Sequence, residues 1–240
     1  MVSAFLWGGL AAASLLIGYF LANRGLSKRH VGIVMGIGTG ALISAIAYEL
    51  VPESALGSGW EMALAFALGA IVFFLGDWYV DHKGGGDRKN IAGNQPGGSG
   101  AAVFIGTLLD NIPESFILGM TMTLNGVINL AFLAAVFISN LPEGVAGTLN
   151  LEASGYSRKK VFWMWMGLVA ISAVCAGAGF WAISILPEAD GRMAKAFAAG
   201  AMLTMLSDVM IPEAHEHGGN TVGLFTVFGF LLAAMLSMLQ

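Results

Sequence analysis

The sequence is poor in charged residues and has a single cysteine. Lys, Arg, Asp and Glu make up 11% of the 240 residues, against 57% hydrophobic residues, and the mean hydropathy is +0.77. This composition excludes an ordinary water-soluble domain. Cys175 stands alone in an apolar run, so it forms no internal disulfide and is expected to be a small buried side chain. The few basic residues form no patch with interleaved aromatic residues, which excludes nucleic acid as a partner.

Apolar stretches of about 20 residues recur along the chain, each long enough to cross about 30 Å of hydrocarbon. Polar, Gly and Pro residues separate them. We therefore expect an all-α integral membrane protein, surrounded by membrane lipid, with one transmembrane domain over residues 1–240. The eight expected transmembrane helices cover 3–22, 31–51, 60–80, 99–124, 126–148, 159–185, 192–213 and 221–239. A flexible loop is expected at 81–98, which is rich in Gly, Asn and polar residues.

Lys and Arg are concentrated in alternate loops. Nine of the 11 follow the first, third and fifth helices: Arg24, Lys28, Arg29, Lys83, Arg88, Lys89, Arg158, Lys159 and Lys160. The other side holds only Arg192 and Lys195. The positive-inside rule places the more basic loops in the cytoplasm, so both termini face outward. The sequence thus predicts a multi-pass protein of the cell (inner) membrane with both termini extracytoplasmic.

Two pairs of segments repeat within the chain. Residues 40–53 align without gaps with residues 200–213, and D-N-I-P-E-S at 110–115 aligns with S-N-L-P-E-G at 139–144. The members of each pair lie on helices separated by an odd number of crossings, so they run in opposite directions. This pattern is typical of inverted repeats in secondary transporters. It predicts a 3+2+3 architecture, in which helices one to three are mirrored by six to eight around a central pair.

Three acidic residues lie inside the expected central helices. Asp110 and Glu114 are four residues apart, on one face of helix four, and Glu143 lies in the inner half of helix five. A carboxylate at the centre of a membrane helix costs about 2.5–3.5 kcal/mol. No expected span carries a central Lys or Arg to offset these charges. The remaining partners are protons, water or a bound cation.

Neutral oxygen atoms accompany these acids. Asn111 and Asn140 lie beside them in the sequence, and Pro113 and Pro142 have no N–H to donate to the carbonyl four residues earlier. Carboxylate, amide and carbonyl oxygens suit hard or borderline divalent cations. The two segments therefore predict an oxygen-rich cation site. If the two helices pack side by side, Glu114 and Glu143 are placed to bridge two ions.

The motif x-N-x-P-E-[GS] on both the fourth and fifth of eight spans resembles the ZIP (Zrt/Irt-like) metal transporters, in particular the GufA-like bacterial branch. The resemblance covers essentially the whole chain, including the outward termini, the long cytoplasmic loop and the inverted three-helix repeats. It implies a secondary transporter that moves divalent metal cations toward the cytoplasm by alternating access, with helices one, four, five and six sliding against the other four. It implies metal ligands at Asp110, Asn111, Glu114, Asn140 and Glu143.

The chain departs from the family pattern at one of these ligand positions and at one residue beside them. Asp110 stands where the family usually has His, and Ser139 stands where members often carry a stronger ligand. The family's long loop is often rich in His, whereas here it holds only His82. Loss of the imidazole ligand favours oxygen-preferring ions. The expected cargo is Zn²⁺, Fe²⁺, Mn²⁺ or Cd²⁺, as a transported substrate, and no cofactor is expected.

Further acidic and His residues lie near the ends of helices two and seven. They are candidates for guiding metal to and from the site: Glu49, Glu53, Asp208, Glu213, His215 and His217. For P-E-A-H-E-H at 212–217 the alternative is a solvated helix end, and the spacing of His215 and His217 favours chelation. Gly32, Gly36 and Gly40 permit close helix approach, either inside one chain or between two copies in a homodimer.

Two other functions would use buried acids. An intramembrane enzyme needs them for general acid and base chemistry. The spans contain no H-E-x-x-H, G-x-S-x-G or G-x-G-D signature, so an enzyme is not expected. A cation or proton channel would use the same acidic path. Slow, saturating flux distinguishes a carrier from a channel.

Overall fold

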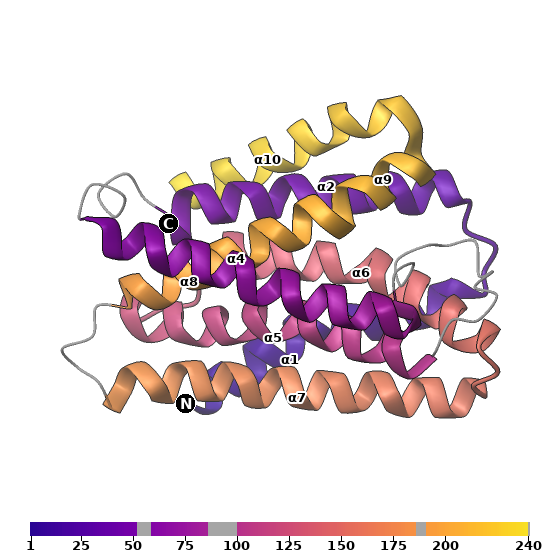
Figure 1. The fold of residues 1–240 in the computed structure, drawn as a ribbon, viewed down its shortest axis with the longest axis horizontal. Coiled ribbons are helices and arrows are strands. Elements are labelled where there is room, and N and C mark those ends of the chain that lie inside the picture. The colour runs from indigo at the N-terminus through magenta and orange to yellow at the C-terminus, as the bar shows by residue number, and fades with distance from the viewer. Residues whose placement is uncertain (52–58, 86–99, 186–190, 240) are drawn as a thin grey trace.

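The computed structural model describes residues 1–51, 59–85, 100–185 and 191–239, and within them the regular structure is entirely helical. The helices lie roughly parallel and form one elongated bundle (Figure 1). In chain order they are α1 (Val2–Ala22), α2 (Lys28–Ala45), η1 (Ile46–Leu50), α4 (Trp60–Val80), η2 (Asp81–Gly85), α5 (Gly100–Asn125), α6 (Leu130–Ala153), α7 (Arg158–Ile185), α8 (Arg192–Met205), η3 (Leu206–Met210), α9 (Ile211–Gly218), η4 (Gly219–Thr221) and α10 (Val222–Met238). The segments η1, η2 and η3 are π-helical, and η4 is a 3₁₀ turn.

Local side-chain contacts explain where several helices begin. The helix expected from residue 31 begins at Lys28, because the Ser27 hydroxyl accepts a hydrogen bond from the His30 amide at 3.3 Å. The helix expected over 126–148 begins at Leu130 instead. Gly126 has a positive φ of 74°, and the Asn129 side chain caps the Phe132 amide at 2.7 Å.

Seven stretches of helix are long and apolar enough to cross a membrane, among the residues that the structure describes. The last of them, Arg192–Met238, has 47 residues. As one straight helix it would extend about 70 Å, more than twice the hydrocarbon thickness. The backbone turns at Gly219, where φ is 70°, and α10 then runs back beside α2 (Figure 1). Both chain ends lie toward the same end of the bundle (Figure 1).

Two π-helical segments occupy equivalent places in the repeated segments. The segment η1 interrupts the helix that begins with α2, and η3 interrupts the helix formed by α8 and α9. Ile46 and Leu206, the first residues of the two segments, are 160 residues apart, which is also the offset between residues 40–53 and 200–213. Short π-helical bulges of this kind are often found at functional sites.

Glycines allow two pairs of helices to touch through their backbones. A Cβ atom on Gly40 of α2 would lie 1.8 Å from the carbonyl oxygen of Thr226 in α10, and one on Gly200 of α8 would lie 1.9 Å from that of Phe66 in α4. The two contacts are equivalent in the repeat, because Gly200 lies 160 residues after Gly40 and Phe66 lies 160 residues before Thr226. The contacts Gly69–Phe197 and Gly229–Ile37 follow the same rule.

The glycine series of α2 packs inside one chain. Gly32 lies against the backbone of Gly218, and Gly36 lies against the side chain of Val222. Together with the Gly40 contact, these neighbours show that α9 and α10 cover this face of α2. The glycine series therefore allows close approach of helices inside one chain, which is one of the two possibilities expected from the sequence.

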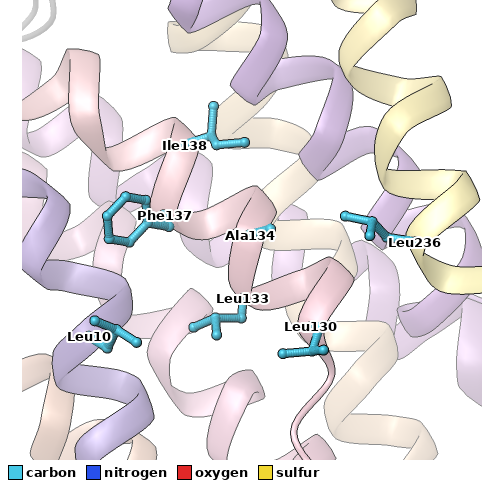
Figure 2. A pocket seen from close by; sticks show the side chains of 7 residues that line it. All are labelled: Leu10, Leu130, Leu133, Ala134, Phe137, Ile138 and Leu236. Carbon is cyan, nitrogen blue, oxygen red and sulfur yellow. The ribbon is translucent and has the colours of Figure 1, made fainter. Parts of the chain in front are cut away.

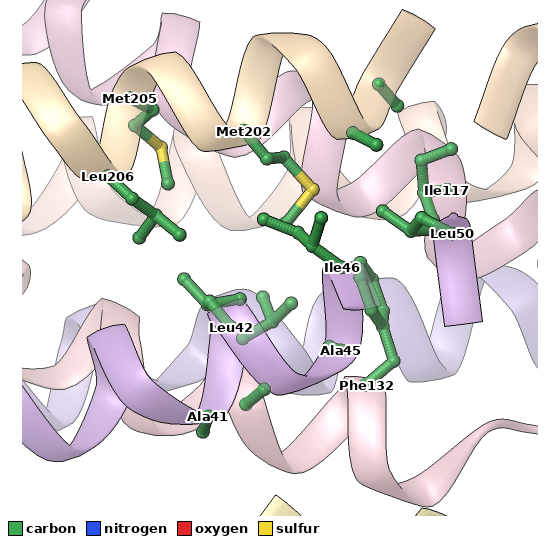
Figure 3. Close-up of a cluster of buried hydrophobic side chains, with 14 of the residues drawn as sticks. Ala41, Leu42, Ala45, Ile46, Leu50, Ile117, Phe132, Met202, Met205 and Leu206 are labelled. Carbon is green, nitrogen blue, oxygen red and sulfur yellow. The ribbon is translucent and has the colours of Figure 1, made fainter. Parts of the chain in front are cut away.

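The central core connects α2 and α8 through the two π-helical segments. Figure 3 shows Met202, Met205 and Leu206 facing Leu42 and Ile46, and Phe132 and Ile117 complete the cluster from α6 and α5. These buried side chains pack the central helices α5 and α6 against the two repeated segments in this conformation.

Candidate metal site

The residues expected to bind metal on α5 are all buried. The exposed fractions of Asp110, Asn111 and Glu114 are 1%, 1% and 2%. The helix α5 continues past Pro113 without a break. The i, i+4 spacing places both carboxylates on one stripe of the helix, with Asn111 beside them. The α5 part of the expected site is therefore enclosed by protein.

The corresponding segment of α6 is buried to the same degree. Asn140 is 1% exposed and Glu143 is 4% exposed, and Pro142 again lies inside a continuous helix. The Ser139 hydroxyl donates to the Val136 carbonyl at 2.9 Å. The Ser139 hydroxyl is thus bonded to the backbone of its own helix.

A hydrogen bond between two amides joins the repeated segments. The side-chain nitrogen Nδ2 of Asn140 donates to Oδ1 of Asn111 at 3.1 Å, and Nδ2 of Asn111 donates to the carbonyl oxygen of Thr107 at 3.0 Å. Because the Thr107 carbonyl can only accept, it fixes which end of the Asn111 amide is nitrogen, and Asn111 in turn fixes the Asn140 amide. We call this chain of contacts the asparagine clasp.

The asparagine clasp leaves one buried oxygen without a partner. Oδ1 of Asn140 accepts no hydrogen bond from the described residues, although the side chain is 1% exposed. A buried amide oxygen in this state costs about 1–3 kcal/mol. A cation beside it would remove that cost, which makes Oδ1 of Asn140 a candidate metal ligand.

The described residues do not contain three His, Cys, Asp or Glu side chains close enough to hold a metal ion together. The clasp brings Asn111 and Asn140 together, whereas convergence of Asp110, Glu114 and Glu143 on one point is not observed. A complete ligand set in this conformation would have to include amide oxygens.

Packing on α7 holds the site segment of α6 in place. The indole nitrogen of Trp165, which is fully buried, donates to the Thr148 hydroxyl at 2.9 Å, and that hydroxyl donates to the Gly144 carbonyl at 2.6 Å. Gly147 makes room for the indole ring, since a Cβ there would lie 2.8 Å from it. These contacts begin one residue after Glu143.

The residues expected to guide metal at the helix ends are dispersed. Glu49, in η1, forms a short hydrogen bond with Ser237 of α10, and Asp208 is exposed in η3. Nε2 of His217 lies 3.0 Å from Oε2 of Glu213, and both side chains are largely buried. Glu53 lies outside the described residues.

The expected chelation by His215 and His217 does not fit the observed helix. Both residues lie in α9, and residues two apart in a helix project in different directions. His215 is exposed, whereas the buried His217 side chain pairs with Glu213 four residues earlier. Within α9, the close contact of His217 is therefore with Glu213 and not with His215.

An acidic cavity lies between α4 and η3, and two of its acidic residues, Asp77 and Asp81, were not expected from the sequence to belong to a site. Its volume is about 440 Å³, and its acidic lining residues are Asp77, Asp81 and Asp208. Asp77 is only 6% exposed although it lies in an apolar helix. The signal that could have indicated it is the i, i+4 pair of aspartates at the end of the third expected span.

Comparison with known proteins gives several relatives that are named zinc transporters. The zinc transporter GufA of Myxococcus xanthus is 29% identical over 232 residues, which are 91% of this chain and 90% of that protein. The human zinc transporter ZIP11 is 31% identical over 159 residues, which are 60% of this chain and 45% of that protein. The chain is thus similar to proteins that are named zinc transporters, GufA and ZIP11. The expected resemblance to the GufA-like branch is thereby confirmed.

The ZIP relatives also support the expected absence of enzymatic function, since they are transporters. ZIP11 of Xenopus tropicalis is 31% identical over 161 residues, 63% of this chain and 44% of that protein. The chain thus spans less than half the length of the ZIP11 proteins that it matches. No family model matches the chain. Together with the long apolar helices, the ZIP relatives identify a multi-pass membrane protein.

Proposed function

We propose that this protein is a secondary transporter that moves divalent metal cations toward the cytoplasm through the buried site on α5 and α6. The observation that carries the proposal is the asparagine clasp, which joins the two repeated segments and leaves Oδ1 of the buried Asn140 without a hydrogen-bond donor. Asp110, Asn111, Glu114, Asn140 and Glu143 are the proposed ligands. The related GufA and ZIP11 proteins, named zinc transporters, support metal as the cargo.

The donor atoms favour hard or borderline cations. All five proposed ligands offer oxygen, and the position at which the family usually has His is Asp110. Oxygen ligands suit Mn²⁺ and Fe²⁺ as well as Zn²⁺, while Cd²⁺ is a useful probe of the same path. We infer that selectivity is broader than for a site with imidazole ligands.

The proposed topology has eight crossings, with both termini outside the cytoplasm of a cell (inner) membrane protein. The turn at Gly219 supports it, because it divides Arg192–Met238 into two antiparallel helices. The excess of Lys and Arg in alternate loops supports the orientation. The inverted repeat is supported by the two π-helical segments and by the backbone contacts of Gly40 and Gly200, all related by 160 residues.

Alternating access is proposed to move one group of helices against the other. The helices α1, α5, α6 and α7 pack extensively on one another. The glycine contacts join α2 to α10 and α4 to α8. Movement of the first group would carry the asparagine clasp with it, which exposes the site first on one side and then on the other.

Metal uptake by reconstituted protein tests this function. We expect Glu114→Gln and Glu143→Gln to abolish uptake of Zn²⁺ or Mn²⁺ into proteoliposomes, because each removes a negative charge from the buried site. Glu61→Gln, at an exposed position in the first turn of α4, is the matched control and should retain uptake. Unchanged uptake in both site variants, with folded protein, would rule out this site.

A cation or proton channel is the alternative function, because it would use the same buried acids. The two differ in kinetics. A carrier that alternates between two states gives slow uptake that saturates with metal concentration, whereas a channel gives fast flux with weak saturation. Uptake that remains linear over a wide range of metal concentration would favour the channel.

A further inference from the structure

An apolar groove of about 390 Å³ lies over the first half of α6, between α1 and α10. Figure 2 shows Leu10 of α1 on one side and Leu236 of α10 on the other. The floor is formed by α6 residues spaced three or four apart, on one face of the helix. They are Leu130, Leu133, Ala134, Phe137 and Ile138. All the lining residues are apolar, and we call this feature the α6 groove.

The α6 groove extends along α6 from the first residue of that helix to Ile138. Leu130 is the first residue of α6, and Ile138 lies about 12 Å further along the helix at about 1.5 Å per residue. One leaflet contributes about 15 Å of hydrocarbon. Leu236, which lines the same groove, lies near Met238, the last residue of α10. The groove therefore follows the direction and length of a lipid tail.

We propose that the α6 groove binds one acyl chain of a phospholipid, from the leaflet on the side of the two termini. Its volume equals roughly a dozen water molecules at about 30 Å³ each, and methylene groups are of similar size. An acyl chain there would contact protein on three sides, which bulk lipid does not offer. An extended peptide would instead bring unpaired backbone groups into hydrocarbon.

A bound acyl chain would touch helices of both moving groups. The walls come from α1 and α6 on one side and from α10 on the other. A small enclosed cavity of about 30 Å³ lies behind the groove and shares Ala134, Ile138 and Leu236 with it. Ile138 directly precedes the site segment that begins at Ser139. Sliding of α6 past α10 would therefore change the shape of the groove, which makes the proposed lipid sensitive to the transport cycle.

Photolabelling of the full chain in liposomes tests lipid binding independently of transport. The probe is a phosphatidylcholine with a photoreactive diazirine in one acyl chain, diluted in unlabelled lipid, with labelled peptides mapped by mass spectrometry. We expect labelling of residues 130–138 to saturate at a low fraction of probe. Labelling around Leu68, an exposed apolar residue of α4, should rise in proportion to the probe.

Filling the groove should remove the saturable labelling. Ala134→Phe places a ring on the groove floor, and Leu68→Phe is the control that adds an aromatic ring on an exposed face. Leu10→Phe narrows the groove from a position that is 46% exposed, and it is used if Ala134→Phe does not fold. Proportional labelling of residues 130–138, saturable labelling that survives a folded groove variant, or cross-linking of the groove to a second protein chain would overturn the proposal.

Discussion

The side-chain amide of Asn140 donates to that of Asn111 at 3.1 Å, across the interface of α5 and α6. The two residues occupy the same place in repeated N-x-P-E segments that lie 29 residues apart. The contact is asymmetric, because Asn111 also donates to Thr107 whereas Oδ1 of Asn140 has no hydrogen-bond donor. The repeat thus supplies two like residues, and their surroundings give them different roles.

The asparagine clasp predicts non-additive losses of stability. Asn111→Leu leaves the buried Nδ2 of Asn140 without its acceptor, and Asn140→Leu leaves Oδ1 of Asn111 without its donor, so each should cost about 1–3 kcal/mol of unfolding free energy. The double variant should lose less than the sum, because no half-paired amide remains. Thermal unfolding of the four proteins in detergent measures the coupling. Strictly additive losses would mean that the two amides do not interact.

The glycine contacts predict a sharp difference between Gly→Ala substitutions. Gly40→Ala places a Cβ 1.8 Å from the Thr226 carbonyl, so α10 must move, at a cost of about 1–3 kcal/mol or more. Gly167→Ala and Gly223→Ala meet no atom within 4 Å. In helices they should stabilise by about 0.5–1 kcal/mol. Melting temperatures in detergent give the comparison, and equal effects at all three positions would contradict the observed backbone contact.

The two histidines of α9 should respond differently to removal. His217→Ala removes a largely buried imidazole that lies 3.0 Å from the Glu213 carboxylate, and it should lower stability by about 1 kcal/mol, as is typical for the loss of a packed side chain. His215→Ala, at an exposed position, should change stability by less than about 0.5 kcal/mol. Unfolding and metal uptake are measured on both variants. Equal loss of uptake from the two variants, without a difference in stability, would restore the chelating pair suggested by their spacing.

The sequence was most informative where a residue type recurs in a regular pattern along the chain. Long apolar runs indicate membrane helices, and the two N-x-P-E segments identify α5 and α6 as the central polar pair before any coordinates are known. Burial of Asp110, Glu114 and Glu143 agrees with that expectation. The matching offset of η1 and η3 shows that even a local irregularity of the helix follows the repeated sequence.

Features that depend on contacts between distant helices could not be obtained in this way. The direction of the asparagine clasp is set by the Thr107 carbonyl, which has no signal of its own in the sequence. The pairing of Glu213 with His217 required the helical phase of α9, and the acidic cavity required the packing of α4 against η3.

Cysteine labelling distinguishes eight crossings from seven. In a Cys175→Ser background, Asn220→Cys lies at the turn between α9 and α10, and Asn125→Cys lies at the end of α5, with both positions exposed. If Arg192–Met238 crosses the membrane twice, residue 220 reacts with a membrane-impermeant thiol reagent only from the cytoplasmic side, and residue 125 reacts only from the opposite side. Sealed vesicles of known orientation provide both measurements. A single long crossing would instead bury residue 220 in hydrocarbon, where neither side of the membrane gives reaction.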